Sequence, residues 1–136
     1  MQTQSQQTLY EQDLAAWFND TIAKLKAKDF DAIDIDSLIE EIEGLAGRDR
    51  RELKNRLKVL LVHLLKRLYV DAPQDYRGWE LTIQEQREQL SDLLEQSPSL
   101  RNHLIKTFPD IWQRSLSTVR AEYPSDQFPA EWQFSL

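Results

Sequence analysis

Apolar residues recur at helical spacing along most of the chain, and no segment alternates apolar and polar residues as a half-buried strand would. A first helix is predicted from Thr8, which has the capping-box spacing to Glu11. A second helix is predicted from Ser37, which is expected to cap it with Glu40 at the third position. A long central helix is predicted over about residues 48–70. The pattern therefore predicts an all-α fold, a single compact bundle of five to six helices.

The predicted central helix carries the strongest apolar pattern. One stripe of leucines runs along it without a break: Leu53, Leu57, Leu60, Leu61, Leu64 and Leu68. Val62, Leu65 and Tyr69 add a second apolar side. A helix that is apolar on more than one side is buried in a bundle or lies at a subunit interface. Gly44 and Gly47 are predicted to bend the second helix into this one.

The remaining elements follow from the same spacing. A fourth helix is predicted over about residues 78–96 and a fifth over 98–107. Pro109 is expected to break or kink the chain before a sixth helix that reaches about residue 123. Residues 1–8 are predicted to be a disordered tail, and residues 9–136 a single domain that becomes irregular from about residue 124.

Composition narrows the class of protein. The 136 residues include no cysteine, so the chain has no disulfide and no thiolate metal site. The polar first residues carry no secretory signal, and the longest apolar run, interrupted by His63, is far shorter than the roughly 20 residues of a membrane span. We therefore expect a cytoplasmic protein with no membrane segment. The net charge of −6 makes general nucleic-acid binding an unfavoured function.

Charge is unevenly distributed along the chain. Residues 29–43 hold seven acids and no base, whereas residues 48–67 hold eight bases and two acids, a net charge of +6 for the second segment. Opposite blocks separated by a short turn tend to fold back on each other. The sequence therefore predicts that the two segments pair across the bend at Gly44 and Gly47.

Three glutamates and one histidine form the main candidate for chemistry. Glu40 and Glu43 lie on one side of a predicted helix, and with His63 from a neighbouring helix they could bind a divalent metal. With Glu41 added, the set suggests a metal-dependent hydrolase of nucleotides or nucleic acid. The structural alternative is that the glutamates are solvated or paired with bases, and that His63 is a core histidine with one hydrogen bond. No cofactor is otherwise predicted.

Gln86 is the second candidate, because it lies inside the apolar stripe of the predicted fourth helix. A buried amide costs a few kcal/mol unless it is hydrogen-bonded, so a partner such as His63, Glu43 or Thr82 is expected. The functional interpretation is a pocket in which Gln86, Arg87, His63 and Glu43 converge. The structural interpretation is a polar network that fixes the register of the helices.

Three bases of the central helix form the third candidate. Arg51, Lys54 and Lys58 are predicted on one flank and could contact phosphate, as in a nucleic-acid-binding regulator. The alternative is that they pair with acids of the second helix or of a partner, which the acidic composition favours.

The order of motifs resembles that of a bacterial family, common in cyanobacteria, known as domain of unknown function twenty-nine. The matching blocks are Tyr10-Glu11-Gln12-Asp13 with Trp17, LIEEIE (residues 38–43), LLVHLLK (residues 60–66), Trp79 with Thr82-Ile83 and Gln86-Arg87, Ser97-Pro98-Ser99-Leu100, and Phe128-Pro129 with Trp132. The resemblance implies a compact helical domain with no assigned activity. Two departures stand out: Gly78 replaces the family's usual serine, and Ala130-Glu131 replace a usual cysteine-proline pair before Trp132.

The excess apolar surface of the predicted central helix favours one function over the others. A small bundle does not bury such a helix on all sides, so its apolar residues are expected to contact another chain. The sequence therefore favours a non-enzymatic protein-interaction module that self-associates, as a homodimer or with another protein partner. The metal-dependent hydrolase and the nucleic-acid-binding regulator are the alternatives.

Overall fold

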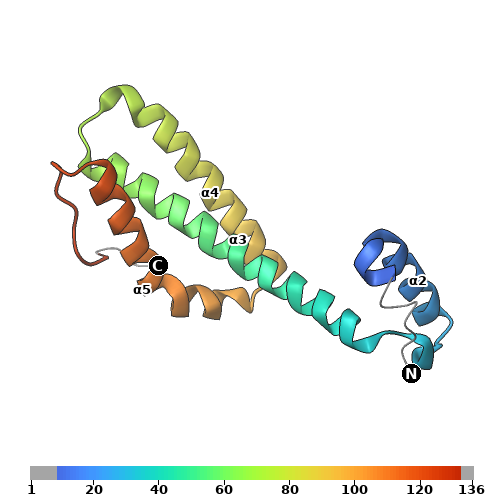
Figure 1. The fold of residues 1–136 in the computed structure, drawn as a ribbon. Helices are drawn as coiled ribbons and strands as arrows, with labels where there is room; N and C mark the ends of the chain where they lie inside the picture. Colours follow the sequence, from blue (N-terminus) through green and yellow to red (C-terminus); the bar gives the residue numbers. More distant parts are fainter. Residues whose placement is uncertain (1–8, 133–136) are drawn as a thin grey trace. The chain divides into compact units, whose positions relative to one another are not determined.

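The protein is all-α in the residues that its structure, a computed structural model, describes: residues 9–132 (Figure 1). This confirms the predicted fold class. A short helical turn at residues 9–12 comes first. The elements that follow are α2 (Leu14–Lys26), η1 (Phe30–Ala32), α3 (Ile35–Tyr69), η2 (Pro73–Asp75), α4 (Tyr76–Gln96) and α5 (Leu100–Glu122). The tail predicted at residues 1–8, with the capping residue Thr8, lies outside the described residues.

The chain divides into two compact units, which we call unit 1 (residues 1–47) and unit 2 (residues 48–136). In the described part of unit 1, Asp13 interrupts the helical turn at residues 9–12 and caps α2. Its carboxylate accepts a hydrogen bond from the backbone N–H of Ala16 at 3.0 Å. The buried side chains of unit 1 are few: Trp17, Thr21, Ile33 and Asp34.

A left-handed residue ends α2. Lys28 has a φ of 58°, and its N–H donates to the carbonyl of Leu25 at 3.1 Å. The N–H of Asp29 donates to the carbonyl of Lys24 at 2.9 Å. This pair of bonds is the Schellman ending, in which glycine usually occupies the left-handed position. Lysine there brings its Cβ close to the following carbonyl, which costs roughly 1–2 kcal/mol.

We therefore expect Lys28→Gly to raise the free energy of unfolding by about 0.5–1 kcal/mol. Relief of the Cβ contact exceeds the larger unfolded-state entropy of glycine. Thermal unfolding followed by circular dichroism measures the change. The matched control is Ala23→Gly at an exposed position inside α2, which should destabilise by about 1 kcal/mol. A lower melting temperature in both variants would contradict the assignment of Lys28.

Helix α3 begins earlier than predicted. Asp34, only 1% exposed, caps it: one carboxylate oxygen accepts from the Ser37 N–H at 3.1 Å and the other from the Ser37 hydroxyl at 2.6 Å. The prediction that Ser37 itself caps the helix is wrong, because Asp34 reaches the free amide of the first turn.

The predicted second helix and the predicted central helix are one helix, because α3 runs from Ile35 to Tyr69 without interruption at Gly44 and Gly47. Glycine weakens a helix by only about 1 kcal/mol and does not by itself end one. Apart from the neighbouring backbone of α3 itself, no atom lies within 4 Å of the position that a Cβ on Gly44 would occupy, so no close approach requires glycine there. Because residues 44–47 are helical, α3 contains no turn there across which the acidic and basic segments could pair.

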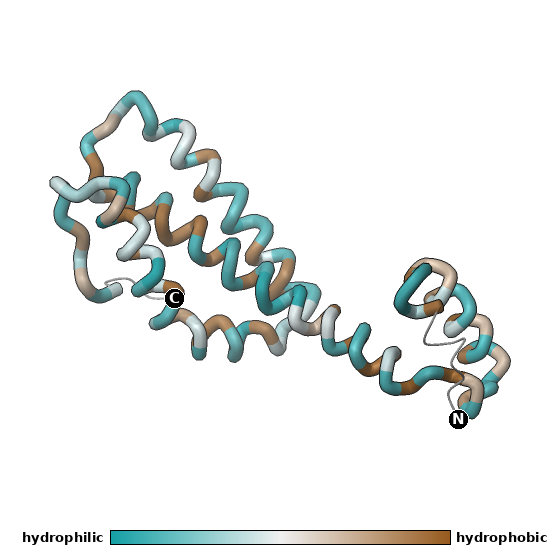
Figure 2. The backbone as a smooth tube through the Cα atoms, viewed as in Figure 1, coloured by the Kyte–Doolittle hydropathy of each residue, from teal (hydrophilic) through white to brown (hydrophobic). Residues whose placement is uncertain are grey.

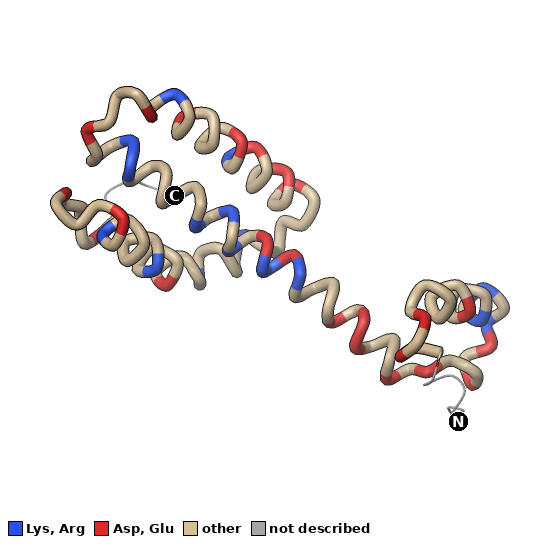
Figure 3. The backbone as a smooth tube through the Cα atoms, turned by 45° about the horizontal axis from the view of Figure 1, so that its top comes forward, with Lys and Arg blue, Asp and Glu red and all other residues tan. Residues whose placement is uncertain are grey.

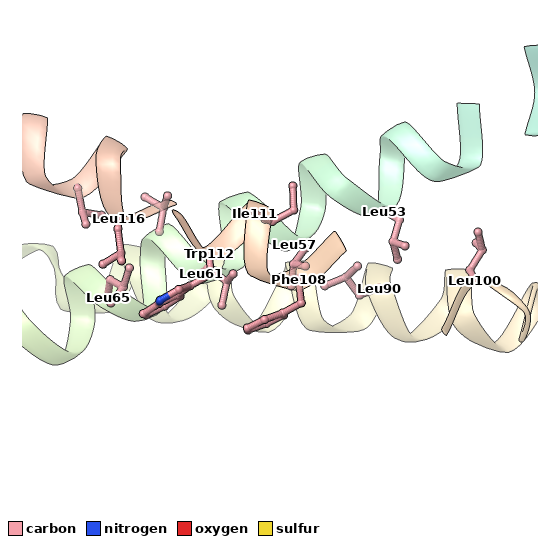
Figure 4. Close-up of a cluster of buried hydrophobic side chains, with 12 residues drawn as sticks. Leu53, Leu57, Leu61, Leu65, Leu90, Leu100, Phe108, Ile111, Trp112 and Leu116 are labelled. Carbon is pink, nitrogen blue, oxygen red and sulfur yellow. The ribbon is translucent and has the colours of Figure 1, made fainter. Parts of the chain in front are cut away.

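The core of unit 2 is built from α3, α4 and α5 (Figure 4). Apolar positions, brown in Figure 2, line α3 at helical spacing. One cluster of buried side chains joins the three helices: Leu53, Leu57, Leu61, Val62, Leu65, Leu90, Leu100, Phe108, Ile111, Trp112, Leu116 and Val119. The apolar stripe of α3 is therefore covered within unit 2, except at Leu68, which is 53% exposed.

The fifth and sixth predicted helices form the single helix α5, so the predicted separation into two helices at Pro109 is wrong. The ribbon of α5 bends along its course in Figure 1, which agrees with the other expected effect of the proline, a kink. Proline removes one backbone hydrogen bond, and the side chains beside it, Phe108, Ile111 and Trp112, are all buried in the core. Their burial favours the continuous helix.

The described chain after α5 is irregular and covers one side of the core. The Trp132 ring lies 5.4 Å from the rings of both Phe108 and Trp112, measured between centroids. The Trp112 indole N–H donates to the carbonyl of Ala130 at 3.0 Å. No helix in the described residues is both long enough and apolar enough to cross a membrane.

Candidate functional site

An open groove of about 560 Å³ lies between α3 and α4 in unit 2. We call it the arginine groove. Six residues of α3 and one of α4 line it: Arg48, Arg51, Glu52, Asn55, Arg56, Val59 and Gln86. The α3 residues follow each other at steps of three, one, three, one and three, which places them on one face of the helix. Three guanidinium groups and one carboxylate give the lining a net charge of +2.

Arg56 is the fixed cation of the arginine groove. Its Nε donates to the Glu52 carboxylate at 2.9 Å, and its Nη1 donates to the Gln86 side-chain oxygen at 3.3 Å. Arg48 and Arg51 are exposed and have no ion pair within the described chain. Two guanidinium groups of the groove are therefore available to a ligand.

Gln86 has a hydrogen-bond partner, as its place in the apolar stripe of α4 requires, but the partner is Arg56. Of the predicted partners, Thr82 bonds elsewhere: its hydroxyl donates to the carbonyl of Gly78 at 3.1 Å. Arg87, the neighbour of Gln86, is exposed and lines a separate shallow depression on α4.

His63 is half-buried in unit 2 and bonded within its own helix. Its Nδ1 lies 2.7 Å from the carbonyl oxygen of Val59. Because a carbonyl only accepts, Nδ1 carries the proton and donates it. His63 does not line the arginine groove. Within the described residues this is its one hydrogen bond, which is the arrangement expected of a core histidine.

The three candidate glutamates lie in unit 1, whereas His63 lies in unit 2. Glu40 and Glu43 are exposed. Glu41 accepts a hydrogen bond from the Tyr10 hydroxyl at 2.6 Å. Within the described residues, no three His, Asp or Glu side chains are grouped so as to hold a metal ion. The metal-dependent hydrolase stays a prediction.

The hydrogen bond between Tyr10 and Glu41 changes the acidity of the phenol. It is the largest cause of a rise in the pKa of Tyr10 to about 12, to which burial and the charges of Glu40, Glu41 and Asp34 contribute. The bond joins the helical turn at residues 9–12 to the first turns of α3, so it holds unit 1 together.

The three candidate bases differ in their surroundings. Arg51 lines the arginine groove, whereas Lys54 and Arg50 lie near His103 of α5. Burial lowers the pKa of His103 below its ordinary value, and the charges of Arg50, Lys54 and Lys106 lower it further. Lys58 is half-buried and lines neither site. The spacing of three and four residues keeps Arg51, Lys54 and Lys58 on one flank of the continuous helix α3, but only Arg51 lines the arginine groove.

Lys66 is a buried cation that the sequence pattern did not single out. Its Nζ lies 2.9 Å from a carboxylate oxygen of Glu122, and 5.9 Å and 5.8 Å from the ring centroids of Trp79 and Tyr123. The carboxylate and the two aromatic faces stabilise the buried ammonium group inside unit 2. We assign Lys66 a structural role.

The exposed apolar residues are concentrated in unit 1. Of twelve large apolar side chains that are exposed in the described chain, nine belong to unit 1: Leu14, Phe18, Ile22, Leu25, Phe30, Ile35, Ile39, Ile42 and Leu45. Four of them recur along α2 at steps of four, four and three, and four along the start of α3 at steps of four, three and three. We call these nine residues the apolar surface.

Acids accompany the apolar surface. The 39 described residues of unit 1 include ten acids and three bases, a net charge of −7. Asp36, Glu40 and Glu43 follow each other at steps of four and three along the start of α3, beside the row of Ile35, Ile39 and Ile42. All three carboxylates are exposed. An acidic row thus borders an apolar row on the same helix.

The chain belongs to the family described as Domain of unknown function DUF29, whose model matches residues 9–136. The resemblance inferred from the motifs is thereby confirmed. No curated protein and no solved structure matches the chain.

Proposed function

We propose that this protein is a non-enzymatic interaction module that binds a basic, amphipathic helix of another protein on the apolar surface of unit 1. One observation carries the proposal: nine of the twelve exposed large apolar residues in the described chain lie in unit 1, whose described part holds 39 of the 124 described residues. Contiguous apolar surface on a soluble protein marks an interaction site.

The chemistry of the partner follows from charge. The acidic row Asp36, Glu40 and Glu43 borders the row Ile35, Ile39 and Ile42, and unit 1 carries a net charge of −7. An amphipathic helix docks its apolar face in such a surface through anchors three or four residues apart. Lysines or arginines that flank those anchors would face the acidic row and accelerate association.

This partner replaces the second copy of the chain that we expected from the sequence. Leu53, Leu57 and Leu61, which motivated self-association, are covered by α4 and α5. Pairing of two apolar surfaces would bring net charges of −7 and −7 together. Unit 2 offers only three exposed large apolar residues in its described part, so it is a poor complement to the apolar surface.

The test uses the full chain and a labelled 18-residue peptide with leucines at helical spacing, flanked by lysines. Fluorescence anisotropy should show binding that weakens as salt rises. Two control peptides separate the contributions: one carries glutamate in place of lysine, and the other has the same composition in scrambled order. Both should bind at least about 10-fold more weakly, because each lacks one of the two complementary features.

Two variants locate the site. Ile39→Asn, on an exposed position of α3, should weaken peptide binding about 10-fold, whereas Ile105→Asn, equally exposed on α5, should leave it unchanged. Equal affinity for all three peptides would refute the proposal. Sedimentation measures the oligomeric state of the free chain. If the chain is a dimer and Ile39→Asn dissociates it, a second copy of the chain, and not a basic helix, covers the apolar surface.

A further inference from the structure

We propose that the arginine groove of unit 2 is a binding site for a compact ligand that carries a chain of two or three phosphate groups. The site is separate from the apolar surface and independent of its partner. It joins α3 to α4 through Arg56 and Gln86, and its volume of about 560 Å³ falls in the range of small-molecule sites.

The cations of the arginine groove are spaced for more than one phosphate. At 1.5 Å of rise per residue, the eight steps from Arg48 to Arg56 span about 12 Å along α3. Arg51 lies between them on the same face. A guanidinium group presents a planar fork of donors that matches phosphate oxygens two at a time. Three forks along about 12 Å match a short oligophosphate better than a single small anion.

Arg56 is already oriented for binding. Glu52 accepts from its Nε and Gln86 from its Nη1, so two donor positions are occupied and the rotation of the side chain is restricted. The other N–H groups of the guanidinium remain available. A cation that is fixed before the ligand arrives loses less side-chain entropy on binding. The hydrogen bond of Gln86 to Arg56 thus positions a ligand-binding group, besides satisfying a half-buried amide.

The surroundings favour a compact ligand over a nucleic acid. Figure 3 shows acidic residues along α4 next to the basic stretch of α3. Among the acids of α4, Glu85, Glu88 and Asp92 are exposed. A long polyanion that left the groove across α4 would meet these carboxylates, and the whole chain carries a net charge of −6. A ligand confined between Arg48 and Arg56 avoids them.

Titration of the full chain with sodium tripolyphosphate, without divalent metal, tests the proposal. Calorimetry measures affinity, and amide chemical shifts measured by NMR locate the site on α3 and α4. Arg51→Gln should weaken binding about 10-fold, and Arg48→Gln with Arg51→Gln more strongly, because each change removes a charge-assisted contact. Arg101→Gln, which removes the same charge at an exposed position of α5, should change the affinity by less than about 2-fold.

Further probes define the ligand. If ATP binds more tightly than tripolyphosphate, the natural ligand is a nucleotide; equal affinity indicates that the phosphate chain alone is recognised. The proposal is overturned by the absence of binding at millimolar tripolyphosphate, by equal weakening in the Arg101→Gln control, or by tighter binding of a 12-nucleotide RNA than of either probe. These phosphate-binding results do not depend on the peptide experiment. The Ile39→Asn variant, which tests the apolar surface, retains the arginine groove.

Discussion

Replacement of Leu61 by alanine is expected to lower the free energy of unfolding of unit 2 by about 2–5 kcal/mol. Leu61 is 1% exposed in the middle of the cluster that joins α3, α4 and α5. The truncation removes apolar contacts and leaves a cavity that the neighbouring helices fill only in part. Urea denaturation followed by far-ultraviolet circular dichroism measures the loss. For a domain of this size, the change is a large fraction of the total stability.

Leu68→Ala is the matched control for this prediction. Leu68 lies one heptad further along the same helix, and 53% of its surface is exposed. Its truncation should change the free energy of unfolding by no more than about 0.5 kcal/mol. If the two variants lost the same stability, the core that we assign to α3 would be misplaced.

The second large effect is expected in unit 1. Trp17 is fully buried, and its ring lies 4.8 Å from that of Tyr10 and 5.5 Å from that of Phe18. Trp17→Ala should destabilise the fold of unit 1 by about 3–5 kcal/mol, because the few other buried residues there cannot compensate for the loss. Hydrogen exchange followed by mass spectrometry should show residues 9–47 losing protection, while the core helices of unit 2 retain theirs.

Phe18→Ala separates folding from binding. Phe18 is adjacent to Trp17 but 39% exposed, and it belongs to the apolar surface. This variant should retain most of its protection in residues 9–47 and bind the basic peptide more weakly. If Phe18→Ala lost as much protection as Trp17→Ala, Phe18 would belong to the core of unit 1 and not to the apolar surface.

The class of fold and the core of α3 were predictable because both depend on one physical regularity. Leu53, Leu57 and Leu61 recur every four residues, and a helix brings such positions to one face. Burial of that face against other helices is the main source of helix stability in a protein, so the spacing alone indicates which side points inward.

Helix boundaries were less predictable, because they depend on small energies that packing exceeds. Gly44 and Pro109 each disfavour a helix locally, yet α3 and α5 continue through them. Asp34 and Ser37 both have the chemistry of a cap, and only the fold decides which one reaches the free amide. Lys28 occupies a left-handed position that the sequence does not reveal, since glycine is the usual residue there.

The candidate site, too, was predictable only in part. The need of Gln86 for a partner follows from its place on α4, but the identity of Arg56 depends on which faces of α3 and α4 meet. Helical spacing could have grouped Arg48, Arg51 and Arg56 on one face. The prediction relied instead on the opposite charges of the acidic and basic segments. Their pairing required a turn that α3 does not contain.

The concentration of negative charge in unit 1 has a consequence for colloidal behaviour. Unit 2 contains 14 basic and 13 acidic residues and is therefore close to neutral. The electrostatic repulsion between molecules of this protein thus comes almost wholly from residues 9–47. A bound helix with about six positive charges would cancel it. The complex would then sit at its isoelectric point near neutral pH, where proteins condense most readily. Occupancy of one small surface could therefore decide whether the protein stays dispersed or gathers into a dense phase.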